Sequence, residues 1–136
     1  MGKVWQTGGC ACGAVRYTLT ATPKWTALCH CESCRRATSA PVVAWMGFAP
    51  SDVAWSGQRQ SHASSPHAMR SFCPTCGSPM SFESERWPGE LHLYGVSLDD
   101  PDAYIPQLHC YTDEHLSWLS IADDLPRFSQ SADVEA

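Results

Sequence analysis

Three cysteines lie close together in the stretch ALCHCESCRR, at Cys29, Cys31 and Cys34. Their C-x-C-x-x-C spacing allows one turn of chain to bring all three sulfurs to a single metal ion. These residues are named the thiol triad here. A closed structural zinc site has four protein ligands, whereas a catalytic zinc site has three and keeps one position for water or substrate. The group of three therefore indicates a metal site whose fourth ligand has to be found.

Four further cysteines form two close pairs, which lie far apart in the chain. They are Cys10 and Cys12 in CACG, and Cys73 and Cys76 in CPTCG. In a C-x-x-C-G turn the backbone N–H groups can point at sulfur, and the glycine can adopt the positive φ that completes the turn. Together the pairs supply the four thiolates of a structural zinc site, and such a site stabilises folding directly. The alternative, a thioredoxin-like redox pair at Cys73 and Cys76, requires a βαβ context that the sequence lacks. The four residues are named the cysteine quartet.

Three interpretations of the thiol triad are open on the residues alone. The fourth ligand is water or substrate at a catalytic zinc, or a protein group from Cys110, His30 or His109 at a second structural zinc. The third interpretation is a metal-free group that forms a transient disulfide. Catalytic zinc is favoured because such sites characteristically have three protein ligands. We expect the His30 side chain to point away from the metal, as a surface or supporting residue, and Cys110 to be a buried, inert thiol.

Length, composition and charge limit the possible functions. The chain of 136 residues fits a single domain over 1–136, with a core at about 8–128 and an acidic tail at 129–136. We expect a cytoplasmic protein without a secretory signal or membrane span, because the longest apolar run is too short to cross a bilayer. In such a compartment close cysteine pairs indicate metal or catalysis. A net charge of −5 without a basic stripe argues against a nucleic-acid partner, and a homo-oligomer is possible.

The hydrophobic pattern predicts a mainly β fold with little helix. VRYTLT and PMSFES alternate apolar and polar residues, and ELHLYGVSL and PVVAWMGF are further candidate strands. Ten prolines and nine glycines divide the chain into short elements, and no stretch has the pattern of a three-turn amphipathic helix. The polar stretch SGQRQSHASSPH, residues 56–67, is predicted to be a mobile loop.

The chain resembles the glutathione-dependent formaldehyde-activating enzymes and their relatives, which include centromere protein V. The resemblance covers about residues 8–128 and lies in GGCACGAVRY, CHCESCRR, FCPTCGSPM, GVSLDDP and a C-terminal H…W…DDLPRF pattern. It implies a β-tent fold of small antiparallel sheets with two zinc ions, one structural on the quartet and one on the triad with an open fourth position. One departure is Ser39, where the family commonly has glycine in a tight turn.

The resemblance also implies a function and its partners. The expected activity is that of a zinc-dependent carbon–sulfur lyase, acting on the adduct of glutathione or another small thiol with an aldehyde such as formaldehyde. A thiol that joins zinc on the triad would lose its proton. Arg35 and Arg36 are candidates for binding a glutathione carboxylate, and His109 is a candidate proton shuttle. The alternatives are a non-enzymatic zinc-binding module and a zinc-thiolate sensor.

Overall fold

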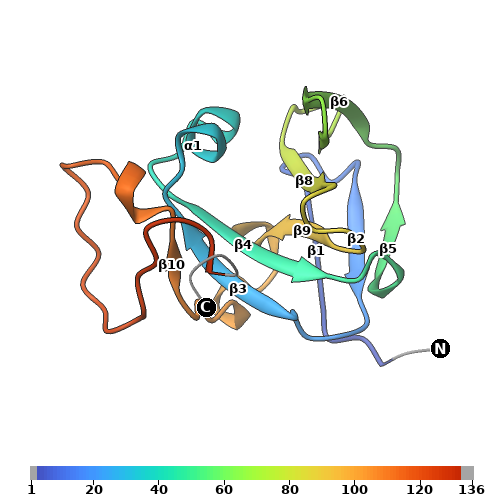
Figure 1. Cartoon of the computed structure of the whole chain (residues 1–136). Coiled ribbons are helices and arrows are strands. Elements are labelled where there is room, and N and C mark those ends of the chain that lie inside the picture. The colour runs from blue at the N-terminus through green and yellow to red at the C-terminus, as the bar shows by residue number, and fades with distance from the viewer. Residues whose placement is uncertain (1–2, 133–136) are drawn as a thin grey trace. The chain divides into compact units, whose positions relative to one another are not determined.

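The computed structural model describes residues 3–132 and confirms a mainly β protein (Figure 1). The strands are β1 (Gln6–Gly9), β2 (Arg16–Leu19), β3 (Trp25–Cys29), β4 (Val43–Phe48), β5 (Val53–Ser56), β6 (Gln60–Ser65), β7 (Ala68–Phe72), β8 (Pro79–Ser84), β9 (Leu91–Tyr94) and β10 (His109–Cys110). The helical elements are α1 (Glu32–Thr38) and the short 3-10 turns η1 (Pro50–Asp52), η2 (Gly95–Ser97), η3 (Pro101–Ala103) and η4 (Thr112–Glu114). Within residues 3–132, no helix is long and apolar enough to span a membrane.

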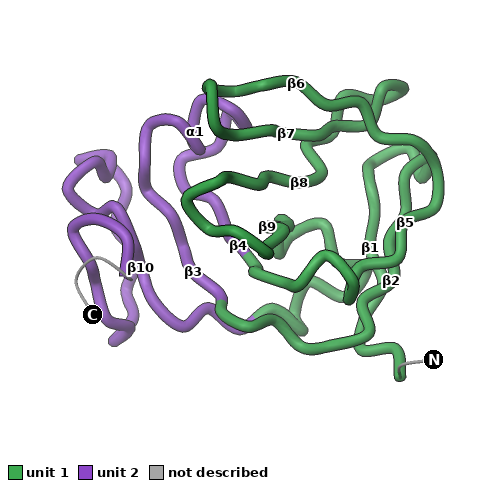
Figure 2. Tube along the Cα trace, turned by 45° about the vertical axis from the view of Figure 1, so that its right-hand side comes forward, with its two compact units in different colours: residues 1–25, 46–104 green, residues 26–45, 105–136 purple. Residues whose placement is uncertain are grey.

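The chain forms two compact units, each built from two separate segments (Figure 2). Unit 1 contains residues 1–25 and 46–104, and unit 2 contains residues 26–45 and 105–136. The cysteine quartet lies in unit 1 and the thiol triad in unit 2. Each metal site can therefore be described within its own unit, and a single domain over 1–136 stays a prediction.

Unit 1 holds an antiparallel sheet in the order β1-β2-β5 and the strands β9-β8-β7-β6 of a second sheet. The alternation predicted for VRYTLT is confirmed, because Val15, Tyr17 and Leu19 are fully buried while the residues between them are half-exposed. Gly8 pairs with Tyr17 across β1 and β2, and a Cβ at Gly8 would collide with the Tyr17 hydroxyl. Glycine is therefore needed where these strands pass each other.

The prediction of a mobile loop at 56–67 is wrong, because most of this stretch is strand. β6 pairs antiparallel with β7, with His62 opposite Arg70. All six residues of β6 are exposed, so neither face of the strand has to be apolar. Alternation of apolar and polar residues indicates a strand with one buried face. A strand with both faces exposed does not show this pattern.

Unit 2 places β3 beside β10 in parallel, with Leu28 opposite His109 and Cys29 opposite Cys110. Because successive side chains of a strand point to opposite faces, Cys29 and Cys110 share one face of this pair and His109 lies on the other. α1 follows β3 almost directly, with Cys31 as its N-cap. The end of β3 and the start of α1 together carry the thiol triad.

α1 ends at Thr38, and its C-cap residue Ser39 has the left-handed backbone conformation with φ of 53°. The Ser39 N–H caps the helix by donating to the carbonyl of Arg35. Glycine adopts this conformation without the steric cost that a side chain brings. The tight turn expected at this position is present, with a residue that fits it less well than glycine.

Candidate metal centres

The structure brings the four sulfurs of the cysteine quartet within 4.8 Å of one another. The Cys10 and Cys12 sulfurs are 3.6 Å apart, and those of Cys12 and Cys73 are 3.8 Å apart. Four sulfurs at a Zn–S distance of about 2.3 Å in a tetrahedron stand about 3.8 Å apart. The donor set and its spacing therefore fit zinc.

Backbone N–H groups point at the quartet sulfurs from two similar turns. Val15 N–H donates to Cys10 Sγ at 3.3 Å, and Cys76 N–H donates to Cys73 Sγ at 3.5 Å. Gly13 and Gly77, which follow the two pairs, have φ of 83° and 79°. Hydrogen bonds from the side chain and backbone of Ser78 lower the pKa of the Cys76 thiol to about 5. This hydrogen bonding favours the thiolate of Cys76, which is the form that binds metal.

The three sulfurs of the thiol triad also lie within 4.8 Å of one another. Cys29 ends β3, Cys31 caps α1, and Cys34 lies in the first turn of the helix. The sulfurs of Cys29 and Cys34 are 3.8 Å apart, which is the separation expected for two ligands of one zinc ion. The Cys34 N–H donates to Cys31 Sγ at 3.3 Å, so the turn that starts the helix also orients a ligand.

Thiols crowd around Cys29, which is buried. Hydrogen bonds with the thiols of Cys110, Cys31 and Cys34, followed by burial, raise the pKa of the Cys29 thiol far above its ordinary value. Several thiolates at this spacing repel one another unless a cation lies between them. An all-sulfur set with these separations suits a soft divalent ion such as zinc.

Cys110 was predicted to be a buried, inert thiol, and the structure differs from this prediction. It is half-exposed, stands opposite Cys29 across β3 and β10, and hydrogen-bonds the Cys29 thiol. Among the described residues, however, the group of sulfurs within 4.8 Å contains only the triad. Cys110 therefore lies next to the triad but is not part of it. The alternation of side chains along a strand could not reveal this contact, because Cys110 and Cys29 are far apart in the sequence.

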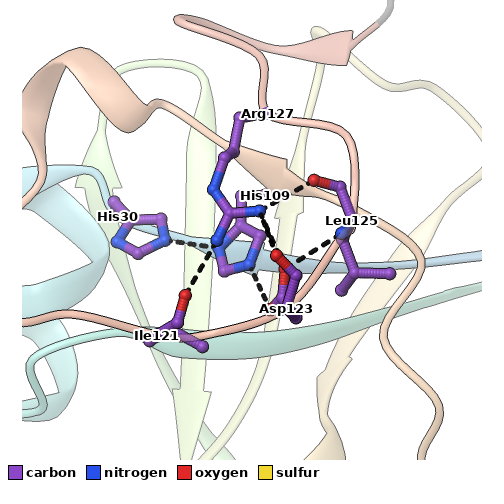
Figure 3. Close-up of polar contacts among 6 residues, drawn as sticks. All are labelled: His30, His109, Ile121, Asp123, Leu125 and Arg127. Atoms are coloured by element: carbon purple, nitrogen blue, oxygen red, sulfur yellow. Dashed lines mark hydrogen bonds and ion pairs between the residues drawn. The ribbon is translucent and has the colours of Figure 1, made fainter.

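The two histidines near the triad belong to unit 2 and are hydrogen-bonded to each other (Figure 3). His30 is 6% exposed and His109 is 1% exposed. Of the two roles expected for His30, the surface role is therefore wrong, and the supporting role stays a prediction. The His30 Nε2 lies 2.8 Å from His109 Nδ1, and the His109 Nε2 lies 2.9 Å from Asp123 Oδ2. Neither histidine is among the residues that form the group able to hold a metal ion with the triad. From the sequence, Asp123 had been noted only as part of the C-terminal DDLPRF pattern.

The two arginines after the triad have different surroundings. Arg35 donates through Nε to the His30 carbonyl at 3.0 Å and through Nη2 to the Glu114 carbonyl at 3.1 Å. The Arg36 side chain is 80% exposed, and its Nε lies 4.0 Å from a Glu32 carboxylate oxygen. Both arginines line a pocket of about 360 Å³ beside α1, and its other lining residues are Glu32, Ser39, Ala40, Pro41, Leu116 and Trp118. Trp118 was noted from the sequence only as part of the C-terminal H…W…DDLPRF pattern, and Leu116 was missed because its segment has no periodic pattern.

Comparisons with known proteins show which family this chain belongs to. An uncharacterized lyase from Schizosaccharomyces pombe is 32% identical over 75 residues, which span 55% of this chain and 55% of that protein. A crystal structure of a Rhodobacter sphaeroides protein shares the fold, with a TM-score of 0.57 and 23% identity over 69% of this chain and 88% of that one. The family model of the glutathione-dependent formaldehyde-activating enzymes matches residues 5–114. The chain therefore belongs to the family of glutathione-dependent formaldehyde-activating enzymes.

Proposed function

We propose that the protein is a zinc-dependent carbon–sulfur lyase for the adduct of a small thiol with a small aldehyde, such as S-hydroxymethylglutathione. The observation that carries the proposal is the thiol triad, in which three sulfurs among the described residues lie close enough together to hold a metal ion. Three protein ligands are the number that leaves a position for an incoming group. Membership of the family and the lyase named among the relatives support the same class of reaction.

The reaction needs a place where sulfur can carry negative charge. In the cleavage direction the carbon–sulfur bond of the adduct breaks, the sulfur keeps the electron pair as thiolate, and the hydroxyl proton passes to water as the aldehyde C=O forms. When bound by the triad, zinc supplies a Lewis-acidic position at which a thiol gives up its proton. We propose a second zinc on the quartet with a structural role. We place the protein in a reducing compartment such as the cytoplasm, because the ligands must stay reduced, and none of the eight cysteines, all within the described residues, forms a disulfide.

The pocket beside α1 is our proposed binding site for the body of the thiol substrate. α1 carries the triad member Cys34 and also Arg36, whose exposed guanidinium can bind a glutathione carboxylate. Glu32 offers an anion for the glutathione ammonium group, and Trp118 offers an apolar wall that is itself 72% exposed. Arg35 is tied to two backbone carbonyls, so we assign it mainly to holding the turn.

The contacts of His109 argue against the proton shuttle predicted from the sequence. Both of its ring nitrogens are engaged, one with His30 and the other with Asp123. On β10 it also lies on the face opposite Cys110 and hence opposite Cys29. We therefore propose a supporting role for His109 in place of the predicted proton shuttle.

A second candidate function is a non-enzymatic zinc-binding module, and the position of Cys110 favours it. The Cys110 thiol hydrogen-bonds Cys29, so a small movement could offer a fourth sulfur to the triad and close the site. Substitution of Cys110 by Ser separates the candidates. The lyase proposal expects unchanged zinc content and unchanged catalysis in Cys110→Ser, whereas a closed module expects weaker zinc binding by the triad.

The direct test of the proposed lyase is the rate of exchange between glutathione plus formaldehyde and their adduct, followed by NMR exchange spectroscopy. Because the adduct also forms without a catalyst, the rate in buffer is subtracted. We expect acceleration by the zinc-loaded protein and its loss in Cys31→Ser, which removes one triad ligand and leaves the quartet intact. An exchange rate equal to that in buffer would overturn the proposed activity for this substrate.

A further inference from the structure

His30 is held at its backbone and at its side chain, although it is not itself a metal ligand. Its N–H donates to the Cys110 carbonyl at 3.1 Å, and its carbonyl accepts from Arg35 Nε at 3.0 Å. Its ring is fixed by the 2.8 Å hydrogen bond to His109 (Figure 3). Because His30 lies between the ligands Cys29 and Cys31, any rotation of its backbone would move both sulfurs.

The chain of hydrogen bonds from Asp123 to His30 has one favoured direction. The Asp123 carboxylate can only accept, so His109 Nε2 carries a hydrogen and donates to it. With His109 neutral, its Nδ1 accepts from the Nε2–H of His30. The His30 Nδ1 then carries a lone pair, and it is buried without a partner among the described residues. The reverse arrangement would bury an N–H without an acceptor at that atom, which native structures rarely do.

Asp123 is itself anchored by the C-terminal segment that contains DDLPRF. Arg127 donates through Nη1 to Asp123 Oδ1 at 2.8 Å and through Nη2 to the Ile121 carbonyl at 2.9 Å. The Leu125 N–H donates to the same carboxylate at 3.0 Å. The segment thus fixes the acceptor that orients both histidine rings, and it lies about ninety positions along the chain from the triad it serves.

We propose that Asp123, His109 and His30 are positioning residues for the thiol triad, which fix the turn between Cys29 and Cys31 and so set the geometry of its metal site. The inference rests on the triad binding a metal ion, as the proposed function requires, and not on the identity of the substrate. Partners that orient metal ligands typically change metal affinity by about 10–100-fold when removed. The same range is expected here, because a turn that can move holds its sulfurs less firmly.

The test compares zinc affinity of the triad in Asp123→Ala and Asp124→Ala by competition with a chromophoric chelator. Asp124 is the matched control, because it is the adjacent exposed carboxylate. We expect triad affinity to fall about 10–100-fold in Asp123→Ala, to be partly restored in Asp123→Asn, whose carbonyl still accepts from His109, and to stay unchanged in Asp124→Ala. The quartet in unit 1 should keep its zinc in every variant, which reports on folding. Unchanged triad affinity in a folded Asp123→Ala overturns the proposal.

A second measurement on the wild-type chain keeps the test decisive even if Asp123→Ala does not fold. Two-dimensional ¹H–¹⁵N correlation of the imidazole nitrogens reports which nitrogen carries hydrogen. We expect His30 and His109 both to be Nε2–H tautomers, and a hydrogen on His30 Nδ1 overturns the assigned direction. Neither measurement uses glutathione or aldehyde. Failed catalysis with an intact dependence on Asp123 would therefore remove the proposed function and leave this inference standing.

Discussion

At the scale of residues, the two sulfur groups differ in the number of donors rather than in chemistry. The quartet has four sulfurs from two turns, while the triad has three from the end of β3 and the start of α1. Four ligands complete a tetrahedral ion and three do not. The quartet should therefore act in folding, and the triad in binding something from outside the chain.

Substitution of single cysteines should separate the two roles. We expect two zinc ions per chain in the wild type and one in Cys31→Ser, with the fold retained. Cys76→Ser should instead lose solubility and cooperative unfolding, because a structural zinc stabilises folding directly. Metal analysis by atomic emission, together with circular dichroism, checks both. A Cys31→Ser chain that still holds two ions would contradict the assignment of the triad.

Arg36 should contribute to substrate affinity more than to the chemical step. Its exposed guanidinium lines the pocket beside α1, and an exposed charge pair is worth up to about 1 kcal/mol. Arg36→Ala should therefore raise KM for the glutathione adduct about fivefold and leave kcat nearly unchanged. Lys24→Ala removes the same charge from unit 1 and is the control. An equal change in both variants would point to a general charge effect and would count against this pocket.

Asp99 should show a pH dependence that can be measured in unit 1. Hydrogen bonds from Arg16 and then from Thr7 lower the pKa of the Asp99 carboxyl to about 2. A lowered folded-state pKa adds stability above the unfolded value of about 3.9, and this stability is lost as the pH falls towards 2. Asp99→Asn should lower the free energy of unfolding at pH 7 by about 0.2–1 kcal/mol, the range for an exposed ion pair. Urea unfolding at pH 7, with an NMR titration of the carboxyl, tests both. A carboxyl that titrates near 4 would be contrary to this expectation.

At the scale of elements, the site depends on a strand and a short helix that meet at the triad. The sequence indicated the sulfur group from spacing but not the helix, because α1 has only seven residues and no apolar stripe. β6 escaped prediction for a similar reason, since its residues are all exposed. β2 was predictable because its buried face imposes alternation. β8 is a strand as predicted, but the alternation expected for PMSFES is wrong, because Ser81 is buried while Phe82 is half-buried.

Ser39 offers a test of how the C-terminal cap affects α1. Its left-handed φ of 53° is a conformation that glycine adopts at lower energy. Ser39→Gly should raise the free energy of unfolding by about 0.5–1 kcal/mol, visible as a higher midpoint in thermal unfolding of the zinc-loaded protein. Ser33→Gly, placed inside the helix, should do the opposite, since glycine weakens a helix interior. A lower midpoint for Ser39→Gly would be evidence against strain at this cap.

At the scale of the whole molecule, the sequence revealed the two sulfur groups and the mainly β fold, but not the supports of the triad. Cysteine spacing is local and can be read directly. The pairing of β3 with β10 and the contact between His30 and His109 join residues far apart in the chain, so no local pattern encodes them. Asp123 had been noted only as part of a C-terminal motif, and its contact with His109 gives that motif a physical role.

The central claim is that the thiol triad holds a metal ion and leaves one position for an incoming thiol. The most direct measurement is the visible absorption of the cobalt-substituted protein before and after addition of glutathione. We predict stronger sulfur-to-cobalt absorption on addition, with the same response in Cys110→Ser and none in Cys31→Ser. A spectrum already typical of four sulfurs and unchanged by glutathione would contradict the claim.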